Sequence, residues 1–141
     1  MKDIALDAYG DISAFGDGGA WVSDVRQVAQ ALRIRLRTHL AEYFLDSRMG
    51  LPWLDWLGKA SATMLGEIEV SISREILATS GVSRLTKRVS ATWVRDTKTI
   101  QIEFECVVRT PTSEQRLTVT ATAAHTGAIV LMILDQSGAV I

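Results

Sequence analysis

Cysteine, proline and histidine are all scarce in this sequence, and the shortage of cysteine and histidine limits the disulfides and metal sites that the chain could form. Among its 141 residues there are one cysteine, two prolines and two histidines. The single cysteine, Cys106, excludes a disulfide within the chain and a thiolate metal cluster, and it fits folding in a reducing compartment. The two histidines, His39 and His125, have no metal-ligand spacing to each other. We therefore expect neither a metal site nor a cofactor.

Long apolar runs are also missing. The longest, residues 128–134, is far too short to span a bilayer. Asp3 and Asp7 interrupt the first ten residues, which lack the basic-then-apolar plan of a signal peptide. Hydrophobic residues make up 48% of the chain and charged residues 22%, which favours a folded core over disorder. We expect one domain over residues 1–141, made in a cytoplasm, with residues 1–20 as a turn-rich entry segment.

No catalytic motif stands out. Walker, Rossmann and zinc patterns are absent, and the Gly-Asp-Gly-Gly run at residues 16–19 lacks the lysine of a phosphate-binding loop. Hydrolysis of a glycoside needs two carboxylates about 5 to 10 Å apart in a cleft. Glu42, Asp46 and Asp55 are close in sequence, but nothing places them around a groove. The sequence therefore predicts a protein that is not an enzyme.

A helix predicted to begin after Ser23 has two unlike faces. Its apolar face carries Val25, Ala29, Leu32 and Leu36, and its polar face carries Arg26, Gln30, Arg33 and Arg37. Four arginines between residues 26 and 37, without an acidic neighbour, should repel one another unless an anionic group lies opposite. This face is either solvated or faces a partner. Nucleic acid is not favoured, because the whole chain is not basic and no aromatics interleave the arginines.

A corner follows this helix at Gly50-Leu51-Pro52-Trp53. Pro52 stops the helix from continuing, because the residue before a proline disfavours the helical region. Trp53 fits a buried core position. Trp56 fits either the core or the centre of an interface, where tryptophan is enriched.

The second predicted helix covers residues 64–79. Met64, Ile68, Ile72 and Ile76 recur every four residues and form a buried stripe, and Gly81 suits the left-handed position after the helix.

From residue 83 onward the period changes to two, which predicts antiparallel strands. A turn at Asp96-Thr97 sets apolar residues opposite each other (Trp93 with Ile100, Ala91 with Ile102, Val89 with Phe104) and Arg88 opposite Glu105. Only Lys87, opposite Cys106, breaks this pattern. A turn at residues 111–114 sets Val108 opposite Leu117, Cys106 opposite Val119 and Phe104 opposite Ala121. Both turns agree on which face is the core.

The last predicted strand, after Thr126-Gly127, is apolar on both sides. Val130, Met132 and Leu134 would join the core face, which leaves Ile129, Leu131 and Ile133 on the opposite face. A strand that is apolar on both faces requires two covers. Residues 126–141 therefore form a candidate partner-binding strand at the margin of the sheet. The predicted fold class is α+β, with two helices packed on one face of an antiparallel three- to four-stranded β-meander.

The middle of the chain resembles the baseplate wedge and sheath-initiator proteins of contractile-tailed bacteriophages and related injection machines. The resemblance is carried by short motifs in the right order, within residues 3–6 and 22–110. They are Asp3 to Leu6, Thr38, Ala41-Glu42, Tyr43-Phe44, Gly50 to Trp53, Leu57-Gly58-Lys59 and Arg74 to Val82. The chain departs from the family at Ala41, where glycine is usual.

This resemblance implies a small α/β domain without enzymatic activity, in several copies in a six-fold tail baseplate of a virion assembled in the host cytoplasm. Glu42, with neighbouring Arg37, would lock onto a bundle of other wedge proteins, and strands from the first ring of sheath subunits would extend the sheet. Tail tube or hub proteins are further candidate partners, and no nucleic acid or membrane is expected. The candidate partner-binding residues are Arg33, Arg37, Thr38, Glu42, Phe44, Pro52, Trp53, Trp56, Ile129, Leu131 and Ile133.

Two other functions stay open at the level of sequence. One is a peptidoglycan hydrolase, because some members of the resembled family have been called lysozymes. The other is a cytosolic adaptor that binds one protein through the edge of its sheet.

Overall fold

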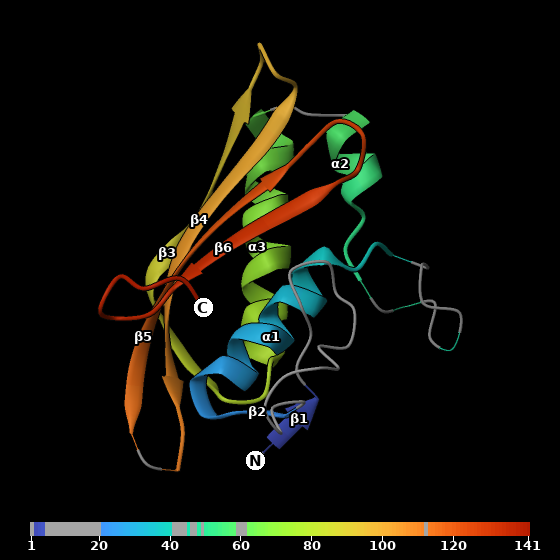
Figure 1. The fold of residues 1–141 in the computed structure, drawn as a ribbon. Coiled ribbons are helices and arrows are strands. Elements are labelled where there is room, and N and C mark those ends of the chain that lie inside the picture. Colours follow the sequence, from blue (N-terminus) through green and yellow to red (C-terminus); the bar gives the residue numbers. More distant parts are fainter. Residues whose placement is uncertain are drawn as a thin grey trace.

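The computed structural model describes residues 2–4, 21–40, 45, 48, 50–58, 62–111 and 113–141. Its centre is a four-stranded antiparallel sheet in which neighbours in the chain are neighbours in space (Figure 1). The strands are β3 (Val82–Val94), β4 (Thr99–Arg109), β5 (Glu114–Ala123) and β6 (Ile129–Leu134). This meander confirms the predicted α+β class.

Helices cover one face of this sheet, as Figure 1 shows. They are α1 (Asp24–Arg37), α2 (Trp53–Gly58) and α3 (Ala62–Ala78). A separate two-stranded antiparallel sheet joins β1 (Lys2–Ile4) to β2 (Trp21–Ser23), directly before α1. No helix in the described part of the chain is long and apolar enough to cross a membrane.

Helices α1 and α3 form where the apolar spacing predicted them, whereas α2 was not predicted. In α1, Ala29, Leu32 and Leu36 are buried, and Val28 joins them. In α3, Ile68, Ile72 and Ile76 form the expected buried stripe. Gly81 follows α3 with a φ of 96°, and a Cβ there would lie 2.5 Å from Cγ2 of Val28. Glycine is therefore required twice over at this position, for its conformation and for the close approach of α1.

The predicted register between β3 and β4 is correct only near the turn that joins them. Trp93 pairs with Ile100 and Ala91 with Ile102, as predicted. β-Bulges then shift β3, so that Lys87, and not Arg88, lies opposite Glu105. Cys106 consequently faces Leu85, not Lys87. Extra residues in a bulged strand restart the alternation, so β3 keeps its charged side chains out of the core.

The predicted β4–β5 register is wrong by two residues. Cys106 pairs with Leu117 and Phe104 with Val119. The turn is centred one residue earlier than expected, and the amide and the hydroxyl of Thr110 both donate to the Ser113 carbonyl, at 2.8 and 2.9 Å. A shift by an even number of residues leaves every side chain on its predicted face. The apolar face of the meander was therefore predicted correctly.

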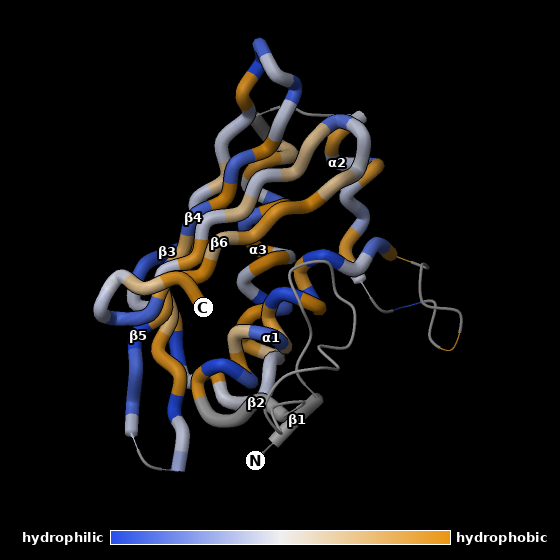
Figure 2. Tube along the Cα trace, in the orientation of Figure 1, coloured by the Kyte–Doolittle hydropathy of each residue, from blue (hydrophilic) through white to orange (hydrophobic). Residues whose placement is uncertain are grey.

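The prediction of which β6 residues face the core is wrong. β6 is apolar along its whole length (Figure 2), and its pairing with β5 sets Val119 opposite Ile133 and Ala123 opposite Ile129. Ile129 and Ile133 are consequently buried, whereas Val130 and Met132 are exposed on the outer face. A loop closed by the Ala124 amide and the Ala128 carbonyl, at 2.9 Å, sets this register. A shift by an odd number of residues exchanges the two faces.

Candidate partner-docking surfaces

The polar face of α1 is less uniform than its sequence suggests. Arg26 is exposed, and Arg33 and Arg37 are half-buried. Gln30, predicted to share this face, is buried with only 8% of its surface exposed. The basic surface of α1 therefore consists of Arg26, Arg33 and Arg37, and we call it the basic face.

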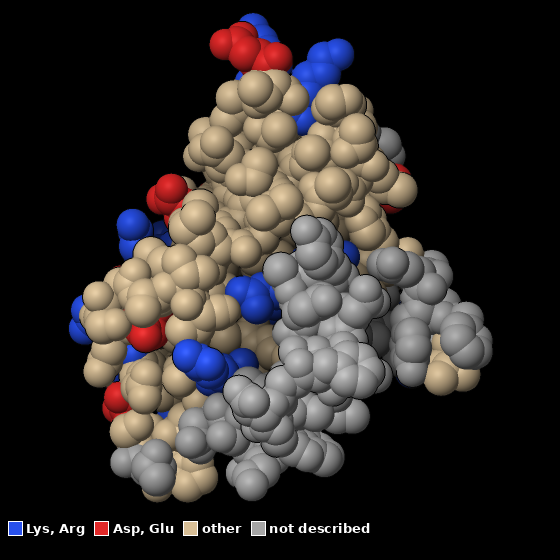
Figure 3. Space-filling model, viewed as in Figure 1, with Lys and Arg blue, Asp and Glu red and all other residues tan. Residues whose placement is uncertain are grey.

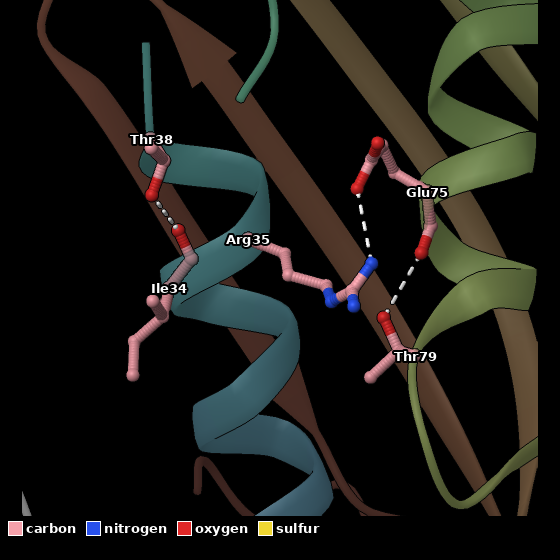
Figure 4. Close-up of polar contacts among 5 residues, drawn as sticks. All are labelled: Ile34, Arg35, Thr38, Glu75 and Thr79. Carbon is pink, nitrogen blue, oxygen red and sulfur yellow. Dashed lines mark hydrogen bonds and ion pairs between the residues drawn. The ribbon is translucent and has the colours of Figure 1, made fainter. Parts of the chain in front are cut away.

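One arginine of α1 is neutralised within the fold. Arg35 forms an ion pair with Glu75 of α3, with Nη1 and Oε2 3.2 Å apart (Figure 4). The backbone carbonyl of Glu75 also accepts a hydrogen bond from Oγ1 of Thr79, at 2.9 Å. This pair joins the two helices and leaves Arg35 outside the basic face. Partly exposed pairs of this kind contribute only about 0.2–1 kcal/mol, so its role is to fix geometry.

Arg33 has a partner from the other end of the chain. Its Nη2 donates to the backbone oxygen of Ile141 at 3.1 Å. Partial burial lowers the pKa of Arg33, and the nearby positive charge of Arg37 lowers it further. The two arginines therefore lie close enough to repel each other. Figure 3 shows basic side chains at the surface over α1, on the side of the molecule where the chain ends.

The tryptophans of the predicted corner belong to the core. Trp53 and Trp56 are both buried and pack edge to face, with ring centroids 5.2 Å apart. Nε1 of Trp53 donates to the backbone carbonyl of Leu36 at 2.8 Å, which satisfies a carbonyl at the end of α1. The prediction of a core position for Trp53 is confirmed. The alternative of an exposed interface anchor at Trp56 is wrong, because the chain's own core occupies its surface.

Backbone pairing holds the two ends of the intervening loop together. The amide of Leu40 donates to the Leu51 carbonyl at 2.9 Å, and the amide of Leu51 donates to the Thr38 carbonyl at 3.0 Å. Half-buried Pro52 follows this pairing. Two of the candidate residues within the loop, Glu42 and Phe44, lie outside the described residues.

The turn between β5 and β6 packs on this corner. Nε2 of His39 donates to the Gly127 carbonyl at 2.8 Å, and a Cβ at Gly127 would lie 3.0 Å from Cδ2 of Leu54. Leu40 and Leu54 are nevertheless exposed. Sequence reasoning missed these two leucines, because only the backbone pairing brings them to the same corner as Thr38. We call this surface the leucine corner.

The edge of β6 is the third candidate surface. The Ile133 carbonyl accepts from the Ile141 amide at 2.9 Å, so the backbone groups of Ile133 point away from β5. Alternation along a strand points those of Ile129 and Leu131 the same way. These two residues have no backbone partner on that side among the described residues. Val130 and Met132 lie beside them on the outer face, with 68% and 54% of their surfaces exposed.

The described residues contain no cluster of three or more His, Cys, Asp or Glu side chains that could hold a metal ion. Burial, assisted by neighbouring Glu105, raises the pKa of the Cys106 thiol to about 12, so it stays protonated. An open groove of about 580 Å³ on the sheet is lined in part by Arg84, Glu114 and Arg116. Its acidic residue, Glu114, is hydrogen-bonded to Arg109.

The described residues form a small α+β fold with three candidate docking surfaces. The sequence matches the family of contractile injection system sheath initiators over residues 2–110. The chain belongs to that family, and is therefore a structural component of a contractile tail. This confirms the family indicated by the sequence motifs, and it implies contacts with other baseplate and sheath components.

Comparison with solved structures agrees on the fold. The chain is similar to the crystal structure of a candidate tail lysozyme from Geobacter sulfurreducens, with a TM-score of 0.53 and 22% sequence identity. The match covers 69% of this chain and 89% of the other. No curated protein matches this sequence. At this level of identity the likeness concerns the fold and not the activity.

Proposed function

We propose that this protein starts sheath assembly on a contractile-tail baseplate, by accepting an extended segment of a sheath subunit along the edge of β6. The supporting observation is the edge at Ile129 and Leu131, whose outward backbone groups have no backbone partner among the described residues, beside the exposed apolar side chains of Val130 and Met132. A strand with unpaired amides and carbonyls is a template for another strand. Main-chain bonds supply affinity, and alternate side chains supply specificity.

The residues of β6 divide this task between backbone and side chains. Ile129, Leu131 and Ile133 offer their backbone groups to the partner while their side chains pack on the core. Val130 and Met132 offer apolar contact on the outer face. The incoming segment would therefore carry apolar residues at alternate positions, one set toward the core and one toward this outer pair.

Docking onto the baseplate is assigned to α1 and the leucine corner. Arg26 and Arg37 have no ion pair or hydrogen bond within the described residues, and they suit an anionic surface on another wedge protein. Thr38, Leu40 and Leu54 add a mixed polar and apolar patch. Glu42 and Phe44 are further proposed partner-binding residues. Several copies in a six-fold ring, assembled in the host cytoplasm, would give the first sheath ring its symmetry.

A reconstitution of sheath on purified baseplates tests the strand-addition proposal. Val130→Glu with Met132→Glu should reduce the number of sheathed tails at least tenfold, because charge enters an apolar contact beside the edge. Both side chains are exposed, so stability should change little. The matched control is Ser90→Glu with Thr92→Glu, two exposed residues of β3. Equal loss in both variants, or loss in neither, contradicts the proposal.

The docking surface has its own test. Arg26→Glu with Arg37→Glu should abolish incorporation into baseplates and leave the circular dichroism spectrum unchanged. Arg88→Glu with Arg95→Glu carries the same change of charge on and beside β3 and should incorporate normally. Recovery of the first variant in six-fold rings would contradict docking through the basic face. A one-to-one complex of the wild type with a single protein would favour a cytosolic adaptor.

We further propose that the protein acts by binding alone. A peptidoglycan cleavage assay, with Glu42→Gln as the matched variant, distinguishes this from hydrolysis. Neither protein should release fragments. Cleavage that depends on Glu42 would support a hydrolase and count against the structural function.

A further inference from the structure

The last residues of the chain fold back onto the edge of β6. After a turn at residues 135–138, Val140 pairs antiparallel with Leu134. The Asp135 amide donates to the Ala139 carbonyl, and the Ile141 amide donates to the Ile133 carbonyl, each at 2.9 Å. We call residues 139–141 the tail. The tail forms an isolated antiparallel bridge with β6, at the position where a partner strand would pair.

The tail occupies only part of this edge. It engages the outward backbone groups at Ile133 and Asp135, and it leaves those of Ile129 and Leu131 open. Its side chains alternate as a strand's should: Ile141 packs against the core, and Val140 is exposed on the outside. A partner strand that ran the length of β6 would need the positions that the tail holds. The tail must therefore leave before a full-length strand can pair.

Two local contacts hold the tail in place. One is the turn, in which Oδ1 of Asp135 accepts from the amides of Ser137 and Ala139, at 2.9 and 3.0 Å. The other is Arg33, whose guanidinium reaches the Ile141 oxygen at 3.1 Å. The tail contains no large buried side chain apart from the partly buried Ile141. Such a segment can open locally without unfolding the domain.

Arg33 also belongs to the basic face of α1. The positive charge of Arg37 lies close enough to act on Arg33. An anionic group bound across this face would compete with the Ile141 oxygen for the Arg33 guanidinium. A carboxylate suits the guanidinium well, because it can accept two parallel hydrogen bonds from it. One side chain thus serves two surfaces.

We propose that the tail is a removable cover over the β6 edge, and that Arg33 couples its release to docking of an anionic protein surface on α1. This inference rests on the proposed function and adds an order to it. Before docking, the tail blocks strand addition and keeps free subunits from pairing prematurely. After docking, Arg33 turns to the new anion, the tail loosens and the full edge becomes available. Binding at α1 and release of the tail are then linked in both directions.

Amide hydrogen exchange of the Ile141 and Asp135 amides, followed by NMR on the whole chain, tests this coupling. Arg33→Ala should speed exchange at both sites at least tenfold, while the Cys106 amide of central β4 keeps its wild-type rate. Arg26→Ala removes a charge from the same face without touching the tail and is the matched control. Wild-type exchange rates in Arg33→Ala would overturn the proposal. So would a matching acceleration at Cys106, because it would mean general destabilisation.

The effect of an anionic partner can be imitated with an octaglutamate peptide. At saturation it should shift the NMR signals of α1 and speed exchange of the Ile141 amide at least fivefold in the wild type, but not in Arg33→Ala. Octaglutamine, which has the same length without the charge, should do neither. Octaglutamate that fails to bind α1, or that binds and leaves Ile141 exchange unchanged, would overturn the coupling.

Sheath reconstitution separates failure of the inference from failure of the function. Deleting residues 139–141 should increase sheath formation by subunits that have not docked. If Val130→Glu with Met132→Glu has no effect on assembly, the function assigned to the edge fails whatever the exchange data show. If that variant blocks assembly while the tail deletion changes nothing, the edge is used and the cover is refuted.

Discussion

The two edges of the sheet are protected in different ways. At β3 the protection is built from side chains and bulges: Oε1 of Glu69 accepts the edge amide of Ala91 at 3.1 Å, and Lys87 and Arg88 project into solvent. At β6 a short backbone segment pairs with part of the edge, and one arginine holds its end. The first kind of protection is permanent, because removing it disrupts the strand. The second is removable.

This difference favours the β6 edge, and not the β3 edge, as the place where a partner strand pairs. Bulges, charged side chains and an inward-pointing carboxylate are devices that keep an edge from pairing. A covering strand of the same chain keeps the edge flat, regular and ready to pair. The apolar outer pair, Val130 and Met132, is likewise found at the β6 edge, whereas Ser90 and Thr92 occupy the outer face of β3. The comparison can be tested by changing one edge at a time.

The largest effect is expected from β6 itself. Ile133→Ala should lower the free energy of unfolding by about 2–5 kcal/mol, because Ile133 is fully buried and its removal leaves a cavity. Met132→Ala, one residue away on the exposed face, should change it by no more than about 0.5 kcal/mol. Urea denaturation measures both. Similar values for the two variants would mean that the faces of β6 are not assigned correctly.

At the other edge, Glu69→Ala should lower the free energy of unfolding by about 1–3 kcal/mol, because it leaves the Ala91 amide without its acceptor. It should also promote self-association, detectable by light scattering. Glu69→Gln keeps an oxygen acceptor at the same place and should remain monomeric. A monomeric Glu69→Ala protein of normal stability would show that β3 does not need this contact.

Two glycines flank β6: Gly127 lies before it, in the turn from β5, and Gly138 lies between it and the tail. Gly127 and Gly138 have φ values of 90° and 87°, so alanine is strained at either position. Gly127→Ala also brings a Cβ to 3.0 Å from Leu54 and should destabilise the whole domain by about 1–2 kcal/mol. At Gly138 a Cβ would meet nothing within 4 Å. Gly138→Ala should therefore speed exchange of the Ile141 amide and leave the urea midpoint unchanged.

The smallest effect concerns the pH dependence of the tail. The Ser137 hydroxyl, followed by the Ala139 amide, donates to the Asp135 carboxylate and holds its pKa below the ordinary value. A lowered pKa means that the carboxylate supports the turn at neutral pH. That support disappears as the pH falls through this lowered pKa, below the ordinary range of an aspartate, and Asp135 becomes protonated. The Ala139 amide signal should shift over that fall in pH in the wild type but not in Asp135→Asn.

Much of the architecture followed from periodicity. Spacings of three and four placed α1 and α3, and alternation placed the strands with the correct core face from β3 to β5. The predicted registers failed at β3, where bulges intervene, and at the β4–β5 turn, which the contact between Thr110 and Ser113 centres one residue earlier. Neither feature has a signal in the pattern of apolar residues. A register error by an even number of residues left each side chain on its predicted face, whereas an error by an odd number exchanged the two faces.

The candidate site was predicted less completely. The sequence predicted the basic face and the apolar character of β6. It predicted the wrong set of β6 side chains to lie outside the core, and it did not decide whether Trp56 is buried. It also missed Val130, Met132 and the leucine corner. The loop that ends at Ala128 decides the side-chain directions of β6, and the corner depends on pairing between Leu40 and Leu51. Both depend on contacts between residues distant in the chain.

The sequence alone determined the class of fold, the family and the presence of an apolar last strand, because these depend on residue type and on spacing within one element. The tertiary structure decided which side of that strand is free, where the tail lies and which arginine holds it. Those features arise where α1 meets the residues that follow β6, with Arg33 and Ile141 108 residues apart in sequence. A local sequence pattern carries no information about a contact of this kind. The energy of the contact comes from groups that become neighbours only after folding.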